Sequence, residues 1–185
     1  HEMGFDTDML YTFKVHQGLL GNGGKLDYAN RDAITEMLKQ NPNIIDVSYG
    51  DDRIVNQDHM TWTRDYKDGS IIFRAFPVSW NFLQMMGIKI EEGRDFMQSD
   101  EHLLTGAYIF NREAADRFGI DLETQIKAHT NELTPVVGIC ENFNFQPLQY
   151  GIEPFAFIVF GQYGWRHPNH AYIRVTAGAD FKELG

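Results

Sequence analysis

The chain is organised around residues 78–111, which read VSWNFLQMMGIKIEEGRDFMQSDEHLLTGAYIFN. Apolar side chains near the start of this stretch share one face of a predicted short helix: Phe82, Leu83, Met85 and Met86. Ser79 is a good N-cap for this helix, because its hydroxyl can accept a hydrogen bond from an N–H of the first turn. Its context lacks the G-x-S-x-G pattern of a serine nucleophile. Gly87 is expected to end the helix, as glycine commonly does.

The second half of the stretch predicts a turn, a strand and the start of a second helix. Residues 88–90 alternate in polarity like a brief strand, and residues 93–96 form a glycine turn with an aromatic anchor. Residues 108–110 are an apolar run typical of a buried strand. Asn111 follows them and is expected to cap the next helix, which Gly119 would end. None of these features is a signature of catalysis.

The amino-terminal part of the chain predicts a strand, a helix and a second strand. Residues 9–16 alternate in polarity, which predicts a strand with one buried face. Residues 27–40 predict a helix that the following Asn-Pro pair would end. Residues 44–49 predict the second strand, and the helix between the two strands is long enough for a crossover. The apolar face of the helix is expected to contain Ala33, Ile34, Met37 and Leu38.

The remainder of the chain is rich in predicted strands. Residues 60–66 and 70–78 are strand-like runs joined at residues 67–69, and an Asp-Gly pair between two such runs is a strong hairpin signal. Further elements are predicted beyond the central stretch: a helix over 112–118 and strands over 124–127, 134–140, 155–160 and 170–175.

These elements indicate an α+β fold with a mixed sheet. The two ends of the chain, about 9–50 and 134–185, are expected to form an outer lobe built on the strand–helix–strand unit. The middle of the chain, about 51–133, is expected to form a smaller inserted α+β lobe.

This division makes two claims about strand placement. The strand at 134–140 should pair with the strand at 9–16 or with the one at 44–49. The first strand and the last, 170–175, should belong to the same lobe, so the two ends of the domain should leave from the same side.

The composition of the chain excludes several kinds of partner. A net charge of −10 argues against binding to a nucleic-acid backbone, which needs clustered Lys and Arg, and against anionic lipid headgroups. No apolar run approaches the roughly 20 residues that a membrane helix needs, and no signal-peptide pattern is found. The single cysteine, Cys140, lies among valines and Ile139 and is expected to be buried rather than reactive.

A glycine-rich segment, residues 18–24, invites comparison with a phosphate-binding loop. Its spacing does not fit, because the position five residues before the Gly-Lys pair holds Leu19 instead of glycine. Leu26 follows Lys25 at the position where Ser or Thr would have to reach magnesium. We interpret the segment as a surface loop.

Metal ligands and acid–base pairs are not predicted either. His167 and His170 are three residues apart, but Pro168 between them excludes the helical His pair of many metal sites. The adjacent carboxylates Asp51–Asp52 and Glu91–Glu92 would point to opposite faces of a strand, so they are interpreted as solvated charge. We therefore expect no enzymatic activity, no cofactor and no metal.

Arg94 is the most prominent single residue of the central stretch. A guanidinium in a glycine turn can clamp a carboxylate or a backbone carbonyl. We expect Arg94 to pair with Asp95, Asp100 or a carbonyl of its own lobe, and Phe96 to be buried. The alternative is contact with a partner, for which Arg94 would point freely into solvent.

The central stretch resembles the MacB-like periplasmic core domain of FtsX-like ABC-transporter permeases, in its Bacteroidetes form. That pattern has a valine-serine pair before a short aromatic helix ending in Met-Gly-Ile. A Gly-Arg-x-Phe turn follows, then an aspartate, and then an apolar strand ending in asparagine before an alanine-bearing helix. The matching residues are Val78, Ser79, Phe82, Met86, Gly87, Ile88, Gly93, Arg94, Phe96, Asp100, Asn111 and Ala114.

Two flanking segments extend the resemblance over nearly the whole chain. Residues 4–7 resemble the segment that follows the first membrane helix of such permeases, and residues 136–148, with Pro154, resemble a later strand and aromatic loop. Cys140 and Asn142 depart from the usual pattern there. The resemblance implies structural roles for Gly87, Gly93, Arg94, Phe96, Asp100, Asn111, Gly138 and Phe143.

The resemblance implies a function that the residues alone do not. Residues 1–185 would form one extracytoplasmic core, with a porter-like outer lobe, at the periplasmic face of the inner membrane. A separate cytoplasmic ATP-binding subunit or domain would drive membrane helices outside these residues. The full-length permease would act as a homodimer or a paired permease and would pass motion to a periplasmic adaptor or substrate protein.

Two other functions remain open from the residues. A sensor ectodomain that binds a small ligand or a peptide would need a preformed pocket with a few convergent polar groups. A stand-alone hydrolase would need a nucleophile–base pair or a metal cluster, and the sequence shows neither.

Overall fold

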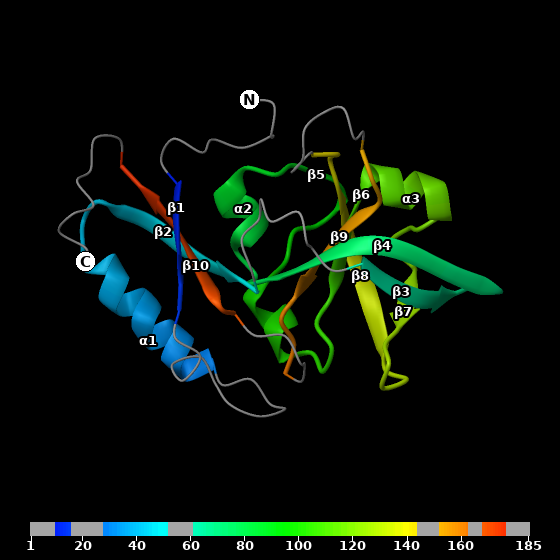
Figure 1. Ribbon diagram of the computed structural model, residues 1–185, viewed down its shortest axis with the longest axis horizontal. Helices are drawn as coiled ribbons and strands as arrows, with labels where there is room; N and C mark the ends of the chain where they lie inside the picture. Colours follow the sequence, from blue (N-terminus) through cyan, green and yellow to red (C-terminus); the bar gives the residue numbers. More distant parts are fainter. Residues whose placement is uncertain (1–9, 16–27, 52–60, 144–151, 163–167, 177–185) are drawn as a thin grey trace.

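Figure 1 shows the computed structural model, which describes residues 10–15, 28–51, 61–143, 152–162 and 168–176. Within these residues, ten strands form a mixed sheet in the order β1-β10-β2-β4-β9-β6-β8-β5, with β3 paired to β4 and β7 paired to β8. The structure confirms the predicted α+β fold with a mixed sheet. Among the described helices, none has the length and apolar character needed to span a bilayer.

The strands are β1 (Leu10–Lys14), β2 (Ile44–Gly50), β3 (Thr61–Tyr66), β4 (Gly69–Val78), β5 (Ile90–Gly93), β6 (Tyr108–Asn111), β7 (Gln125–Lys127), β8 (Leu133–Cys140), β9 (Phe155–Val159) and β10 (His170–Val175). The helices are α1 (Tyr28–Lys39), α2 (Phe82–Met86), α3 (Arg112–Phe118) and the 3-10 helix η2 (Gln98–His102).

One end of the sheet forms what we call the outer group, made of β1, β10, β2 and α1, at the left of Figure 1. β10 lies between β1 and β2 and is antiparallel to both. Ile34 and Leu38 of α1 pack against the apolar core of this group. That core consists of Val15, Ile44, Val47, Tyr49, Ala171, Ile173 and Val175.

The rest of the sheet, β3 to β9 with α2, η2 and α3, forms what we call the inner group. Here β4 is parallel to β9 and β6 is parallel to β8, while β9 and β6 are antiparallel. Aromatic rings dominate its core: Phe73 contacts Phe110 with ring centroids 5.0 Å apart, and Phe143 contacts Phe157 at 5.1 Å. Such edge-on and tilted contacts stabilise beyond the area they bury.

The predicted strand at 134–140 is present as β8, but its predicted partners are wrong. β8 pairs with β5, β6 and β7, and with neither β1 nor β2. β9 also belongs to the inner group, so the division at residue 134 does not match the strand pairing. The physical reason is burial: Val136 and Ile139 of β8 face an inner-group core that includes Phe110. Whether the two groups behave as separable lobes stays a prediction.

The two groups meet at a narrow backbone junction between β2 and β4. A single residue pair, Gly50 with Val78, registers the two strands. The N–H of Ser79 donates to the carbonyl of Tyr49 at 2.9 Å beside it. A Cβ on Gly50 would lie 2.8 Å from Cζ of Phe76, so a larger residue here would press against that buried ring.

The ends of the outer group lie together, as predicted. Leu10 at the start of β1 pairs with Arg174 near the end of β10. The first and last described strands therefore begin and end at the same side of the outer group, away from β3 and β7 in Figure 1.

The buried faces predicted for β1 and α1 are only partly correct. Tyr11 and Phe13 of β1 are exposed, because β1 is the terminal strand of the order and only Leu10 is partly buried. In α1 the inward face holds Ile34 and Leu38 as predicted, but Ala33 and Met37 point outward, with Met37 62% exposed. The helix is rotated relative to its apolar pattern, and a charged residue takes the inner position.

The predicted hairpin is present, but its turn uses different residues. Tyr66 pairs with Gly69, so Lys67 and Asp68 form the turn and Gly69 already belongs to β4. Lys67 has a φ of 53°, a left-handed conformation that a non-glycine residue rarely adopts.

Candidate coupling site between the two strand groups

The predicted clamp of the central turn is present. Nη1 and Nη2 of Arg94 donate to the two carboxylate oxygens of Asp100 at 2.9 and 3.0 Å. Phe96 is buried, as expected. Burial alone would raise the pKa of Asp100, but hydrogen bonds from Arg94 and from the N–H of Met97 outweigh it, so this pKa lies below its usual range. Arg94 therefore fixes its own turn.

Two of the motif glycines let backbone segments pass at close range. A Cβ on Gly138 in β8 would lie 2.3 Å from the carbonyl oxygen of Arg94. A Cβ on Gly93 would lie 2.4 Å from the carbonyl oxygen of Val137, and Gly93 also has a φ of 73°. These contacts hold the Arg94 turn against β8. Gly87 has a φ of 72° and ends α2, as predicted.

The other motif residues are also structural. Asn111 caps α3 by accepting from the N–H of Ala114 at 2.9 Å, as predicted, and its amide donates to the carbonyl of Glu153 at 2.8 Å. It also accepts from the N–H of Phe155 at 3.1 Å. Phe143 packs against the ring of Phe155. The structure therefore places these residues in the scaffold of the inner group, without gathering them around a cavity.

The remaining candidates offer no chemistry in the described part of the chain. No cluster of three or more His, Cys, Asp or Glu residues there could hold a metal ion. The loop at 18–24 and His167 lie outside the described residues. Cys140 is buried, and burial raises the pKa of its thiol. Glu91 and Glu92 do converge, both on Arg112, at a place where the register between β5 and β8 shifts.

The residue that sequence reasoning missed is Arg31, on the inward face of α1. Its Nη1 and Nη2 donate to the two carboxylate oxygens of Glu101 in η2 at 2.6 and 2.9 Å. The side chains of Arg31 and Glu101 are only 5% and 3% exposed. This bidentate pair connects the outer group to the inner group.

Further contacts surround Arg31. The guanidinium stacks over the ring of Tyr28 with 4.3 Å to its centroid, and Nη1 donates to Oγ of Ser79 at 3.3 Å. Burial disfavours the charged form, but Glu101 and Asp32 outweigh it, so the pKa of Arg31 lies above its ordinary value. We call the set Tyr28, Arg31, Ser79 and Glu101 the latch.

The latch corrects the role predicted for Ser79. The N-cap position of α2 is Asn81, which makes no side-chain capping bond. The hydroxyl of Ser79 instead receives the hydrogen bond from Arg31, and its backbone carbonyl accepts from the N–H of Phe82 at 3.1 Å. The amide of Asn81 donates across the junction to the carbonyl of Val47 in β2 at 2.9 Å.

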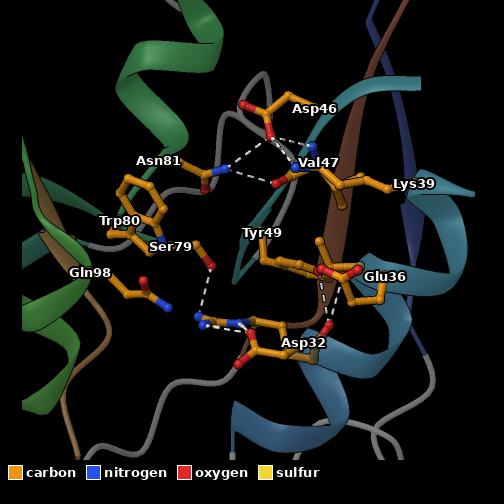
Figure 2. A pocket seen from close by; sticks show the side chains of 12 residues that line it. Asp32, Glu36, Lys39, Asp46, Val47, Tyr49, Ser79, Trp80, Asn81 and Gln98 are labelled. Carbon is orange, nitrogen blue, oxygen red and sulfur yellow. Dashed lines mark hydrogen bonds and ion pairs between the residues drawn. The ribbon is translucent and has the colours of Figure 1, made fainter. Parts of the chain in front are cut away.

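A polar cavity of about 310 Å³ lies beside the latch, between the two groups. Figure 2 shows Asp32, Glu36 and Lys39 of α1 on one side, with Trp80 and Gln98 of the inner group on the other. The remaining lining residues are Arg31, Thr35, Asp46, Val47, Tyr49, Ser79 and Asn81. The cavity thus lies between residues of α1 and β2 on one side and residues near the start of α2 and η2 on the other.

The two groups are in contact at several places. The junction at Gly50 and Val78 is one point of contact, and the Arg31–Glu101 pair is a second. An apolar contact gives a third: Tyr172 of β10 meets Phe82 of α2 edge-on, with ring centroids 5.1 Å apart. Bidentate Arg–carboxylate pairs fix geometry as well as distance. The latch therefore fixes how α1 is oriented relative to η2.

Three solved structures that share this fold come from proteins described as transporters or permeases. The periplasmic region of MacB from Actinobacillus actinomycetemcomitans superposes with a TM-score of 0.61 at 10% identity, over 98% of this chain and 80% of that one. The extracellular domain of the noncanonic ABC-type transporter YknZ from Gram-positive bacteria gives 0.59 at 14% identity, over 83% and 77%. A domain of a protein described as a permease from Porphyromonas gingivalis gives 0.57 at 12% identity, over 95% and 77%.

The fold thus belongs to the class of mixed-sheet extracytoplasmic domains found in ABC transporters. Within that class, the chain has the fold of the MacB-like periplasmic domain, which confirms at the level of fold the resemblance seen in the sequence. No family model matches the chain, and no curated protein matches it in sequence.

Proposed function

We propose that this chain is the extracytoplasmic domain of an ABC-transporter permease subunit, and that it passes motion of the membrane helices to a periplasmic protein. The observation that carries the proposal is the shared fold with three transporter domains, over 83% to 98% of this chain. A second observation supports it. Leu10 and Arg174 lie side by side, so the polypeptide enters and leaves the outer group at one place.

The proposal assigns a role to each part of the full assembly. A cytoplasmic ATP-binding subunit or domain hydrolyses ATP and moves the membrane helices. The outer group follows those helices at the periplasmic face of the inner membrane. Two copies, or a copy and a paired permease, face each other, and the inner group acts on a periplasmic adaptor or substrate protein. The chain itself catalyses no reaction in this scheme.

The latch supplies the connection that such a scheme needs. The contacts that can carry motion from β1, β10 and α1 to the inner group include the β2–β4 junction, the Tyr172–Phe82 contact, the Asn81–Val47 hydrogen bond and the latch. The first is a single residue pair and the second is apolar and non-directional. The latch adds a directional, buried constraint between α1 and η2, which makes the inner group follow the helix.

The test uses the full-length permease with its ATP-binding partner in lipid nanodiscs. A spin label at Met37→Cys, on the exposed face of α1, reports the distance between the two copies by pulsed electron resonance. We expect this distance to change when ATP and vanadate trap the hydrolysis state. A label at Ile72→Cys on β4, also exposed, should move with it. Distances that stay fixed at both sites across the nucleotide cycle would contradict the proposal.

The sequence that flanks residues 1–185 offers a simpler check. The proposal requires apolar runs of about 20 residues on both sides, long enough to cross a bilayer. Flanks without such runs would contradict a permease ectodomain directly.

A sensor ectodomain is a second candidate, and the cavity beside the latch is the observation that favours it. Its volume of about 310 Å³ is sufficient for a small ligand, and it is lined by both charge signs. A sensor would show a saturable ligand-dependent rise in melting temperature that Asn81→Ala removes. It would show no ATP-driven change in the distance between α1 helices.

A further inference from the structure

Besides Arg31 of the outer group, a second arginine of the described residues is buried: Arg64 on β3, in the inner group. Its surroundings differ from those of Arg31. Arg64 is 8% exposed and Arg31 is 4% exposed, so both guanidinium groups are removed from water. Arg31 is neutralised by Glu101. Among the ion pairs of the described residues, none includes Arg64.

Among the described residues, the contacts of Arg64 are with uncharged groups. Its Nη1 donates to the carbonyl of Thr63 at 3.0 Å and lies 3.2 Å from Nε2 of His129. The guanidinium stacks over the Trp62 ring with 4.5 Å to its centroid. Arg64 also lies near the hydroxyl of Tyr108, where it opposes the burial that raises the pKa of Tyr108 to about 12.

Two buried N–H groups at this place lack an acceptor. They are Nε of Arg64 and Nε1 of Trp62, and each is without a hydrogen-bond partner in the described structure. Native proteins satisfy nearly all buried donors, and a buried charge is normally paired. A cation and two unsatisfied donors on neighbouring side chains of one strand face form an incomplete polar site. An acceptor that carries negative charge would complete it.

We propose that Arg64, together with the indole N–H of Trp62, binds an oxyanion, either a carboxylate or a phosphate group. The anion reaches the guanidinium past His129, which is exposed on the loop after β7, and replaces the imidazole nitrogen at Nη1. A charged oxygen is a stronger acceptor for a guanidinium than a neutral ring nitrogen.

The position of the site in the fold bears on what could bind there. β3 and β7 lie at the right of Figure 1, away from β1 and β10, so the proposed site belongs to the part of the inner group most distant from the outer group. An acidic side chain of such a protein and a free anion share the required chemistry. The inference does not depend on the proposed transport function, because an anion site on this chain is testable without membrane or ATP.

The test follows the side-chain indole N–H signals of the ¹⁵N-labelled chain by NMR at about pH 8. The probes are sodium acetate, sodium phosphate and a short Asp-rich peptide, each added at constant ionic strength. We expect a saturable shift of the Trp62 signal, with the Trp80 signal as internal reference. In Arg64→Gln the affinity should fall about tenfold or more, the loss expected when a hydrogen bond to a charged group is removed.

Two further variants keep the test decisive. Arg112→Gln removes an exposed guanidinium of the same group and should leave the Trp62 shift unchanged. His129→Ala removes the competing acceptor from Nη1 and should strengthen binding by a few-fold, and this variant does not disturb the core because His129 is exposed. Tightest binding of the peptide would identify a partner's acidic segment, and tightest binding of phosphate or acetate would identify a free anion.

The outcomes that overturn the proposal are equally clear. The proposal is contradicted if no probe shifts the Trp62 signal, if the shift is the same in Arg64→Gln, or if His129→Ala weakens binding. Any of these results would contradict an oxyanion site in which the anion binds Arg64 and Trp62 and replaces His129.

Discussion

Arg31 and Glu101, 70 positions apart in the sequence, meet through two hydrogen bonds at 2.6 and 2.9 Å. One lies on a helix of the outer group and the other on a 3-10 helix of the inner group. Replacing a buried ion pair with apolar residues is often neutral or stabilising, whereas removing one partner leaves an unpaired buried charge. The main contribution of this pair is therefore to fix the orientation of α1 relative to η2.

The first prediction concerns the energetics of the latch. Arg31→Met and Glu101→Gln should each lower the free energy of unfolding by about 3–5 kcal/mol, because each leaves the other group without its buried partner. The double variant Arg31→Met/Glu101→Leu should lose much less than the sum of the single variants. Urea unfolding followed by circular dichroism measures all three.

The exposed pair Arg117–Glu113 on α3 is the matched control for the latch. Its members are four residues apart on one helix and are largely solvated, so removing either should cost about 0.3–0.5 kcal/mol. Additive losses in the double latch variant would show that Arg31 and Glu101 contribute independently, contrary to this prediction.

The second prediction concerns the space that is available for a Cβ at two glycines. Gly138→Ala should destabilise by about 1–3 kcal/mol, because the new Cβ meets the carbonyl oxygen of Arg94 and neither backbone can yield easily. Gly69→Ala should be near neutral, since nothing lies within 4 Å of its Cβ position. Thermal unfolding of both variants tests this, and equal melting temperatures would show that β5 and β8 can separate without cost.

The third prediction is a pH dependence set by Asp100. Its pKa is lowered in the folded state, so its contribution to stability is present above the unfolded pKa of about 3.9 and is lost as pH falls through the folded value. The stability difference between the wild-type chain and Asp100→Asn should therefore be largest near neutral pH and shrink below about pH 4. Urea midpoints measured from pH 7 to about pH 3 check this, and a constant difference would contradict it.

The stability contribution of Asp95 should depend on pH in the opposite direction. Burial raises the pKa of Asp95, so its ionised form is disfavoured in the folded state. The stability attributable to Asp95 is present below its unfolded pKa and is lost as pH rises through the folded value. Asp95→Asn should therefore change stability least in acid.

The fourth prediction concerns the single thiol. Cys140 is buried in β8 and burial raises its pKa, so both access and thiolate population are reduced. We expect no reaction with a thiol reagent in the folded chain and one equivalent of reaction after unfolding in urea. Rapid labelling without denaturant would show that β8 opens on its own.

Local structure was well predicted from the sequence because its determinants are adjacent residues. Gly87 and Gly119 end their helices with positive φ, and Asn111 caps α3, each by a rule that involves only a few neighbouring positions. The Arg94–Asp100 clamp is also local, because its partners are six positions apart. The sequence signal and the stabilising contact coincide in these cases.

Strand pairing and the latch were not predicted because their causes are remote. The alternation in β8 indicates a strand but does not name the neighbours, and β6 and β9 were available as well as β1 and β2. Arg31 was not singled out in the sequence, because isolated charges on a helix usually are exposed. Its position three residues before Ile34 on the buried face was the one available signal, and only Glu101, far along the chain, explains it.

The position of β10 between β1 and β2 constrains the order in which the chain can fold during synthesis. β1 and β2 emerge first from the ribosome, yet each must wait for residues 170–175 before its main partner exists. The inner group has all its strands by residue 159 and can assemble earlier. The amino-terminal strands thus stay exposed to chaperones until the last strand arrives, and non-local pairings of this kind fold slowly.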